Sequence, residues 1–264
     1  MNIFIRELKA NRKALIIWSI CMALLVLSGM SKYTAYSGGG VSSDVLSKMP
    51  RTLKAFFGMG TLDVTSMSGF YAFLFLYLEL TAAVHAVLLG SNIIAKEERD
   101  KTTEFIIVKP VSRFAIVTQK FLAALFNIVI FNIVTLLSSI MAVSAFNKGK
   151  DITSEIIIFN LSLFFVQLIF LSLGALLAAV LKKPKASGSI GAGIMIAGYM
   201  ISVITNLTDR LDALNVLSPF KYFSYSEIAN GNGLNVVIVI LALALAIILS
   251  ALSYYFYKNR DLNI

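Results

Sequence analysis

Few residues of this chain have the types and spacing that catalysis or metal binding requires. The chain holds one histidine, His85, and one cysteine, Cys21, so neither a histidine-based metal cluster nor a disulfide within one chain can form. The pattern G-x-x-x-x-G-K-[ST] does not occur, which excludes ATP binding through a P-loop. Glu97 and Glu98 are an acidic pair of the kind that some intramembrane proteases use, but those enzymes need further histidines. We therefore predict that the chain is not an enzyme and holds no metal.

Two ionisable residues, Glu79 and His85, lie within one long apolar run. Ionisable side chains inside a membrane are costly, and they are candidates for a transport pathway by default. A spacing of six residues places these two on different faces of a helix. A pathway role and a structural role stay open for both. In the structural interpretation, Glu79 lies near the outer end of its helix or in a hydrated cavity, and His85 bonds a neighbouring helix.

The densest group of charges lies between residues 96 and 120, between two apolar runs. Each of these charges would cost about 3 kcal/mol at the centre of a bilayer, so the segment must lie in water. The ten charged residues are Lys96, Glu97, Glu98, Arg99, Asp100, Lys101, Glu104, Lys109, Arg113 and Lys120.

Within this segment, the four residues 105–108 are apolar and stand in a polar surround. They need cover from the membrane surface or from a groove in another protein. Asp100, Thr102 and Thr103 are good residues to start a helix, and Pro110 is a good residue to end one. An ordinary charged loop is the simpler interpretation, but this pattern favours a short surface helix that docks onto a soluble partner.

The elements that hold these residues are expected to be membrane-spanning helices. Hydrophobic residues make up 58% of the 264 residues and charged residues 14%, against about 45–50% and 25% in soluble domains. The apolar residues come in continuous runs of roughly 20, the length at which a helix crosses a bilayer. Strands of a membrane β-barrel would instead alternate apolar and polar residues over about ten positions. We therefore predict an all-α polytopic membrane protein.

We predict a single transmembrane domain over residues 1–264, with six spans at about 14–30, 69–95, 121–146, 156–181, 186–206 and 234–257. Residues 1–13 alternate apolar and basic positions at helical spacing, which predicts an amphipathic interfacial helix before the first span. A removable signal peptide is the weaker interpretation, because the apolar run is long and no A-x-A site follows it. In the loop after the first span, residues 43–59 predict an amphipathic helix that is broken at Pro50.

Six spans place both termini on one side of the membrane. Lys and Arg number 15 on that side and 8 in the other three loops. Because the loops with the excess of basic residues stay in the cytoplasm, both termini and residues 96–113 are expected to be cytoplasmic. This asymmetry also accounts for the net charge of +9, so we expect no nucleic acid partner.

The fifth span begins with small residues at a spacing of four. Pairs of this kind allow two helices to approach closely. The neighbouring helix can belong to the same chain, which is the more frequent case, or to a second copy. The pairs are Ser187/Gly191, Gly188/Ala192 and Ser189/Gly193.

Four stretches of the chain, in the right order, resemble the permease subunit of ABC-2 type ABC transporters. With the six spans and the amphipathic N-terminus, the resemblance covers the whole chain. One departure is that Thr102-Thr103 stands where the family often has Gly-Thr, which would make the turn there less sharp. The four stretches are Met49-Pro50 with Phe56-Phe57-Gly58, Glu97-Glu98 through Arg113, Leu217 through Phe223, and Asn259-Arg260-Asp261-Leu262.

The resemblance implies the ABC-2, type V exporter-like fold and a division of labour. A separate ABC ATPase subunit would bind ATP and Mg, and this chain would hold no cofactor. A second permease copy, identical or a paralogue, would complete the pathway across the lipid bilayer. Closure of the ATPase pair would push the docking segment and open the path outward by a rigid-body shift. The docking residues would be Glu97, Glu98, Arg99, Lys101, Thr102, Thr103, Glu104, Phe105, Pro110 and Arg113.

The resemblance also implies a multi-pass exporter in the cell membrane of a bacterium, and nothing in the sequence selects a substrate. Two other classes stay open. A self-contained channel or ion-coupled carrier would typically show inverted repeats and several buried charges, and here Glu79 alone fits. A non-transporting membrane scaffold or immunity partner could use the same docking segment.

Overall fold

The computed structural model describes residues 3–37, 50–56, 62–101, 111–147, 149 and 151–260. Within these ranges the regular elements are helices, and six of them are long and apolar enough to cross a membrane. They are α1 (Ile3–Met30), α5 (Met67–Arg99), α7 (Arg113–Phe146), α8 (Thr153–Val180), α9 (Ser187–Leu207) and α11 (Val236–Asn259). The prediction of an all-α membrane protein with six spans is confirmed.

Shorter helical elements connect the long helices at their ends. The α-helical ones are α2 (Tyr33–Ser37), α4 (Arg51–Phe56) and α10 (Tyr225–Ala229). The 3-10 helices are η1 (Pro184–Ala186), η2 (Asp209–Leu217) and η3 (Pro219–Lys221).

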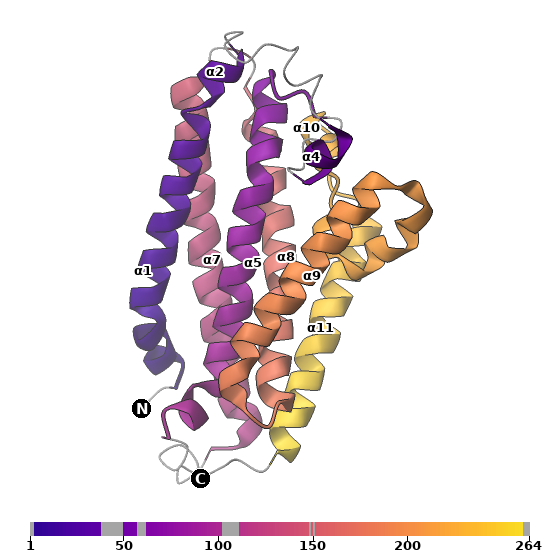
Figure 1. The fold of residues 1–264 in the computed structure, drawn as a ribbon. Helices are drawn as coiled ribbons and strands as arrows, with labels where there is room; N and C mark the ends of the chain where they lie inside the picture. Colours follow the sequence, from indigo (N-terminus) through magenta and orange to yellow (C-terminus); the bar gives the residue numbers. More distant parts are fainter. Residues whose placement is uncertain are drawn as a thin grey trace.

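The helices α5 and α8 form the centre of the bundle. In their most apolar stretches, 67% of the residues of α5 and 61% of those of α8 are buried, against 17% in both α1 and α11. Around this pair, α1 packs on α7, α11 packs on α8, and α9 crosses in front of α5 and α8 (Figure 1). The outer helices therefore keep wide apolar faces open, with Ile17 of α1 61% and Ile247 of α11 66% exposed. Apolar surface on this scale needs a bilayer to cover it.

Two glycines allow α5 and α8 to approach closely. A Cβ atom at Gly90 of α5 would lie 2.0 Å from the carbonyl oxygen of Leu171, and one at Gly174 of α8 would lie 2.2 Å from that of Val87. No side chain larger than hydrogen fits at either position unless the two backbones separate. Farther along the bundle, Asn132 of α7 donates a hydrogen bond to Gln167 of α8.

The small residues at the start of α9 pack partly within the chain. A Cβ at Gly191 would lie 2.6 Å from Val87 Cγ2, and the Ser187 hydroxyl bonds that of Ser91 on α5. At Ser187 and Gly191, the small residues of α9 therefore pack against a helix of the same chain, as the first of the two interpretations predicted. Gly193 lies on the exposed face, and a Cβ there would have nothing within 4 Å.

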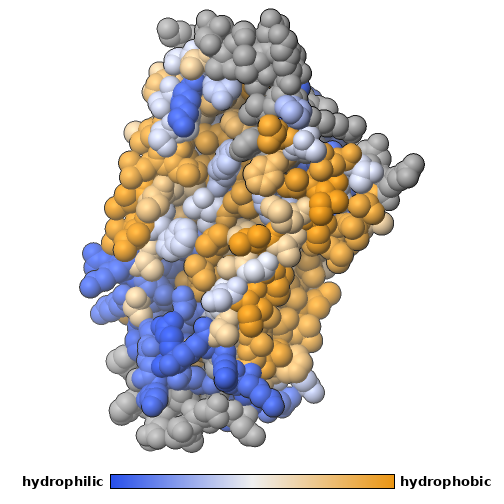
Figure 2. Space-filling model, in the orientation of Figure 1, coloured by the Kyte–Doolittle hydropathy of each residue, from blue (hydrophilic) through white to orange (hydrophobic). Residues whose placement is uncertain are grey.

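The start of α1 and the end of α11 lie at the same end of the bundle, which we call the terminal end (Figure 1). Figure 2 shows hydrophilic residues gathered there and apolar surface along most of the height of the bundle. The opposite end carries α2, α4 and α10 (Figure 1). There the Tyr199 hydroxyl of α9 donates to the carbonyl oxygen of Phe56 in α4.

Several helices run beyond the predicted spans. No break separates residues 3–13 from the first span, because α1 is continuous from Ile3, and the surface location of that segment stays a prediction. The helix α7 begins eight residues before the predicted span at 121, because the Ser112 side chain caps it by accepting from the Ala115 N–H. The helix α4 begins directly after Pro50, while residues 43–49 and 57–59 of the predicted loop helix lie outside the described residues.

Candidate functional site

A cluster of buried charges joins three helices at the terminal end. Glu97 of α5 accepts from Lys120 of α7 and from Arg6 of α1, whose Nη2 lies 2.8 Å from Glu97 Oε1. The same Arg6 nitrogen lies 3.0 Å from Glu7, and Lys96 lies 3.7 Å from the other oxygen of Glu7. Lys120 and Glu7 are 0% exposed and Glu97 is 6% exposed.

Because the charges of this cluster are buried, the stability of the fold depends on their being paired. An unpaired charge in such a place costs several kcal/mol, whereas a charge with a partner and further hydrogen bonds is tolerated. Lys120 also donates to the carbonyl oxygen of Ile93, so its ammonium has two acceptors on α5. The cluster therefore fixes α1, α5 and α7 to one another close to where the segment after α5 begins.

A second group of contacts joins α5, α7, α8 and α11 at the same end. Arg260, the residue directly after α11, lies 2.9 Å from Glu98 of α5 and donates to the carbonyl oxygen of Ala178 in α8 at 2.6 Å. Arg113, the first residue of α7, donates to the carbonyl oxygens of Lys258 at 3.0 Å and Arg260 at 2.7 Å. Together, the two groups tie five of the six long helices at this end.

Toward the opposite end, Glu79 of α5 is bonded to the short helix α10. It is 1% exposed and accepts from the Tyr225 hydroxyl. The Tyr225 ring packs edge-on against Phe75, and Ser68 donates to the carbonyl oxygen of Ala229 at the end of α10. Burial, and then the neighbouring carboxyl of Glu79, raise the pKa of Tyr225 well above its ordinary value, so it stays a hydrogen-bond donor.

His85 lies on the other side of α5, among aromatic rings. Its ring stacks on Phe131 of α7 with centroids 4.6 Å apart, and Trp18 of α1 lies 5.5 Å away. Its Nδ1 has no hydrogen-bond partner among the described residues. The side chain borders a cavity of about 90 Å³ whose other lining residues include Asn11 and Asn127. Glu79 and His85 therefore do not form one site, in agreement with their spacing.

Comparison with known proteins adds the deciding observation. A family model described as ABC-2 family transporter protein matches residues 1–262. The chain belongs to this family. A search of curated proteins finds no match. The family and the six apolar helices together make the protein a multi-pass membrane permease component of an ABC-type transporter.

In this ABC-2 permease, the two glutamates of the predicted docking segment are turned inward. Glu97 and Glu98 bind Arg6, Lys120 and Arg260 of the same chain, because they still belong to α5 and face neighbouring helices. Their ion pairs therefore fix the end of α5, where the docking segment begins, to neighbouring parts of the chain.

The remaining predicted docking residues lie in different surroundings. Arg99 is on the surface, bonded to Asn92 at 2.7 Å and Asp100 at 3.1 Å. Lys101 is exposed and has φ of 54°, where the chain turns away from the end of α5. Arg113 donates from Nη1 to the backbone carbonyl oxygens of Lys258, at the end of α11, and of Arg260. Thr102, Thr103, Glu104, Phe105 and Pro110 lie outside the described residues, and their docking role stays a prediction.

Sequence reasoning missed Arg6, Glu7 and Lys120 as members of a site. It placed residues 1–13 at the membrane surface, and it placed Lys120 in the charged segment that was expected to lie in water, whereas Lys120 is 0% exposed. One signal was present: the permease has acids at the end of one apolar run and a lysine at the start of the next. Consecutive spans run in opposite directions, so these residues reach similar depths. Among the described residues, no group of three or more His, Cys, Asp or Glu side chains could hold a metal ion.

Proposed function

We propose that this ABC-2 permease works with a separate ABC ATPase, which it contacts through residues 96–113, and that ATP hydrolysis in that partner drives export. The observation that carries the proposal is that both ends of this segment are bonded to other parts of the chain. Glu97 and Glu98 lie where the segment leaves α5, Arg113 begins α7, and Lys120 lies two turns inside α7. All four bond residues that belong to other helices or directly follow one.

This arrangement suits the transfer of force from outside the membrane. If the ends of the loop were not bonded to other helices, a displacement of the loop would change the conformation of the loop and leave the helices in place. Here the loop ends are bonded to the terminal ends of α1, α8 and α11 as well, through Arg6, Ala178 and Arg260. A displacement of the segment is therefore expected to move these helices together, as in rigid-body switching.

The proposal includes an orientation. The terminal end would face the cytoplasm, because it carries the excess of basic residues. The ATPase would bind ATP and Mg there, and this chain would hold neither. The opposite end, with α4 and α10, would then border the exit of the pathway.

The proposal also includes a second permease copy, identical or a paralogue. A bundle of six helices with a densely packed centre leaves the pathway to be formed between two copies. The exposed face of α9 supports this, because Ser189 and Gly193 lie on it and Gly193 has open space where a Cβ would be.

The first test is extraction of the tagged chain in a mild detergent, followed by mass spectrometry of the proteins that come with it. A P-loop ATPase in stoichiometric amount is the expected result. A size-exclusion profile with one symmetrical peak serves as the control that the chain is folded. A folded chain without an ATPase would contradict the proposal, and would favour an ion-coupled carrier with Glu79 as its buried acid.

A further inference from the structure

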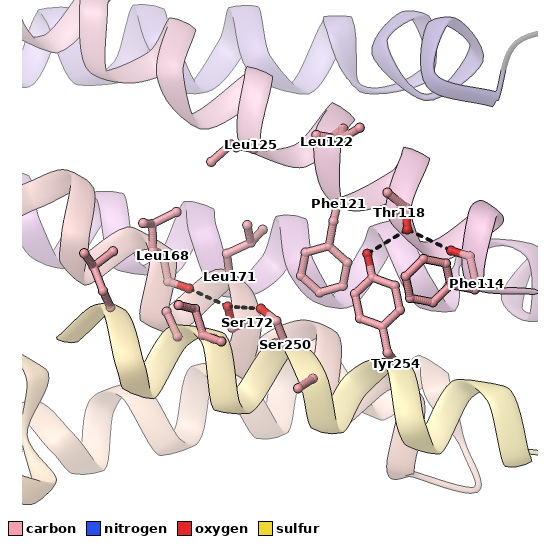
Figure 3. Close-up of a pocket in the computed structure, with 14 residues that line it drawn as sticks. Phe114, Thr118, Phe121, Leu122, Leu125, Leu168, Leu171, Ser172, Ser250 and Tyr254 are labelled. Carbon is pink, nitrogen blue, oxygen red and sulfur yellow. Dashed lines mark hydrogen bonds between the residues drawn. The ribbon is translucent and has the colours of Figure 1, made fainter. Parts of the chain in front are cut away.

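A groove runs along the bundle between α7 and α11, with α8 as its floor (Figure 3). Its volume of about 620 Å³ lies within the range of small-molecule sites. The residues that line it are Phe114, Thr118, Phe121, Leu122, Leu125, Leu168, Leu171, Ser172, Leu243, Ala246, Ile247, Ser250, Ala251 and Tyr254.

The polar atoms in the wall of the groove already have partners. The Tyr254 hydroxyl donates to Thr118 Oγ1 at 3.1 Å, and Thr118 donates to the carbonyl oxygen of Phe114 (Figure 3). The hydroxyls of Ser172 and Ser250 bond each other at 2.9 Å. Because these groups are satisfied, the groove presents hydrocarbon to its occupant, and a polar ligand would gain little there.

The length of the groove matches one leaflet of a bilayer. Its lining starts at Phe114 on α7 and Tyr254 on α11, both close to the terminal end, and reaches Leu125 and Leu243. The lining spans twelve residues on each of these helices, and the eleven steps between them correspond to about 16 Å. The hydrocarbon core of a bilayer is about 30 Å thick, so the groove is about as long as one leaflet is thick.

The mouth of the groove at the terminal end is basic. Lys258 lies one helical turn beyond Tyr254, and Arg113 directly precedes Phe114. Neither has an acidic partner among the described residues, whereas Glu98 nearby is neutralised by Arg260 at 2.9 Å. Arg113 donates to backbone carbonyl oxygens through Nη1 alone, which leaves its charge without a carboxylate partner. An anionic group at this level is therefore favoured by unpaired positive charge, and juxtamembrane lysine and arginine attract anionic lipids.

We propose that the groove between α7 and α11 binds one phospholipid of the leaflet at the terminal end, with an acyl chain in the groove and an anionic headgroup at Lys258 and Arg113. The apolar wall, the length of one leaflet and the basic mouth all fit this occupant. The basic mouth favours an anionic headgroup, which the apolar helix face of a second copy would not supply. The proposal does not depend on ATPase coupling, because it concerns the isolated chain.

The test measures how many lipids each chain retains. The full chain is purified into mixed micelles that contain equal amounts of phosphatidylglycerol and phosphatidylethanolamine, and protein–lipid complexes are counted by native mass spectrometry. The unaltered chain is expected to retain about one phosphatidylglycerol, with a several-fold preference over phosphatidylethanolamine. Equal retention of the two lipids overturns the proposal.

Two variants separate the acyl-chain site from the headgroup site. Leu122→Trp places a larger side chain in the groove and is expected to reduce retention of both lipids several-fold. Leu137→Trp is its control, since Leu137 lies on the same helix outside the groove and is 55% exposed, against 51% for Leu122. Lys258→Gln is expected to abolish only the preference for phosphatidylglycerol, and Lys9→Gln, which removes another exposed charge at the terminal end, is its control.

Two outcomes would overturn the assignment of the groove. One is unchanged retention in Leu122→Trp, measured on a variant whose size-exclusion profile matches that of the unaltered chain. The other is efficient disulfide cross-linking between copies that carry Ala251→Cys in a Cys21→Ser background, because it would place a second chain in the groove.

Discussion

Lys120 of α7 and Glu97 of α5 form an ion pair that is almost completely removed from solvent. In the sequence, each of the two residues stands next to a long apolar run. The pair lies between the two helices that the charged segment connects. Arg6 of α1 adds a second cation to Glu97 at 2.8 Å, so one carboxylate holds three helices. Since burial raises the cost of an unmatched charge, this carboxylate and its partners should be among the least replaceable residues of the protein.

Lys120→Met is expected to destabilise the protein by about 1.5–3 kcal/mol, because the buried Glu97 loses one of its two cationic donors and keeps Arg6. The double variant Glu97→Leu with Lys120→Met should recover part of this loss, since it removes both charges. Thermal unfolding in detergent measures the difference. Asp100→Asn is the matched control, because the Arg99–Asp100 pair is exposed on both sides and should contribute less than about 1 kcal/mol. Equal effects of Lys120→Met and Asp100→Asn would contradict the assignment of the cluster.

Gly90→Ala is expected to disrupt the centre of the bundle. Its Cβ would lie 2.0 Å from the Leu171 carbonyl oxygen, and a backbone atom cannot turn aside as a side chain can. A cost of about 1–3 kcal/mol or more follows from overpacking. Gly193→Ala on α9 is the control, since nothing lies within 4 Å of its Cβ position, and alanine favours a helix by up to about 1 kcal/mol. Similar melting temperatures for the two variants would argue against the close approach of α5 and α8.

The spans could be predicted from the sequence, because a run of about 20 apolar residues has few alternatives to crossing a bilayer. The helix ends were less accessible. The start of α7 at Arg113 depends on the Ser112 cap, and the course of α1 depends on Ile3 and Arg6, which contact other helices. Such contacts between distant parts of the chain cannot be read from the local pattern of residues 1–13, which by itself favours a helix at the membrane surface.

The inward direction of Glu97 and Glu98 could not be predicted, because it depends on the order of helices in the bundle. Their partners Arg6 and Arg260 lie 91 and 162 residues away in the sequence. A charge at the end of an apolar run is usually solvated, so an outward direction was the natural expectation. The helix faces of Glu79 and His85, by contrast, followed directly from their spacing of six residues.

Tyr225→Phe is expected to lower stability by about 1–3 kcal/mol, because it leaves the buried Glu79 carboxyl without its donor. Tyr255→Phe is the control, since Tyr255 is 62% exposed on α11 and its loss should change stability by less than about 0.5 kcal/mol. Thermal unfolding of both variants checks this. A Tyr225→Phe variant as stable as the control would mean that the Glu79–Tyr225 bond does not hold α10 to α5.

Glu79→Gln tests the pathway role of the same residue separately from its structural role. Glutamine keeps an oxygen that can accept from Tyr225, so the variant should fold and assemble. Loss of the ionisable group is expected to alter transport if Glu79 belongs to the pathway. The stimulation of ATPase turnover by a transported compound measures this in the assembled complex. Unchanged stimulation, with normal assembly, would assign Glu79 to structure alone.

Glu104→Arg is expected to reduce copurification of the ATPase several-fold while membrane insertion stays intact, because it reverses a charge in the proposed docking segment, and Phe105→Ala should act in the same direction by removing apolar contact. Glu227→Arg is the matched control, an exposed charge reversal at the opposite end of the bundle. The ratio of ATPase to permease, measured by quantitative mass spectrometry, decides between them. Because Glu97 and Glu98 are engaged within the chain, the proposed contacts with the partner are expected from farther along the segment. Normal copurification in both Glu104→Arg and Phe105→Ala would therefore remove residues 102–110 as the docking element.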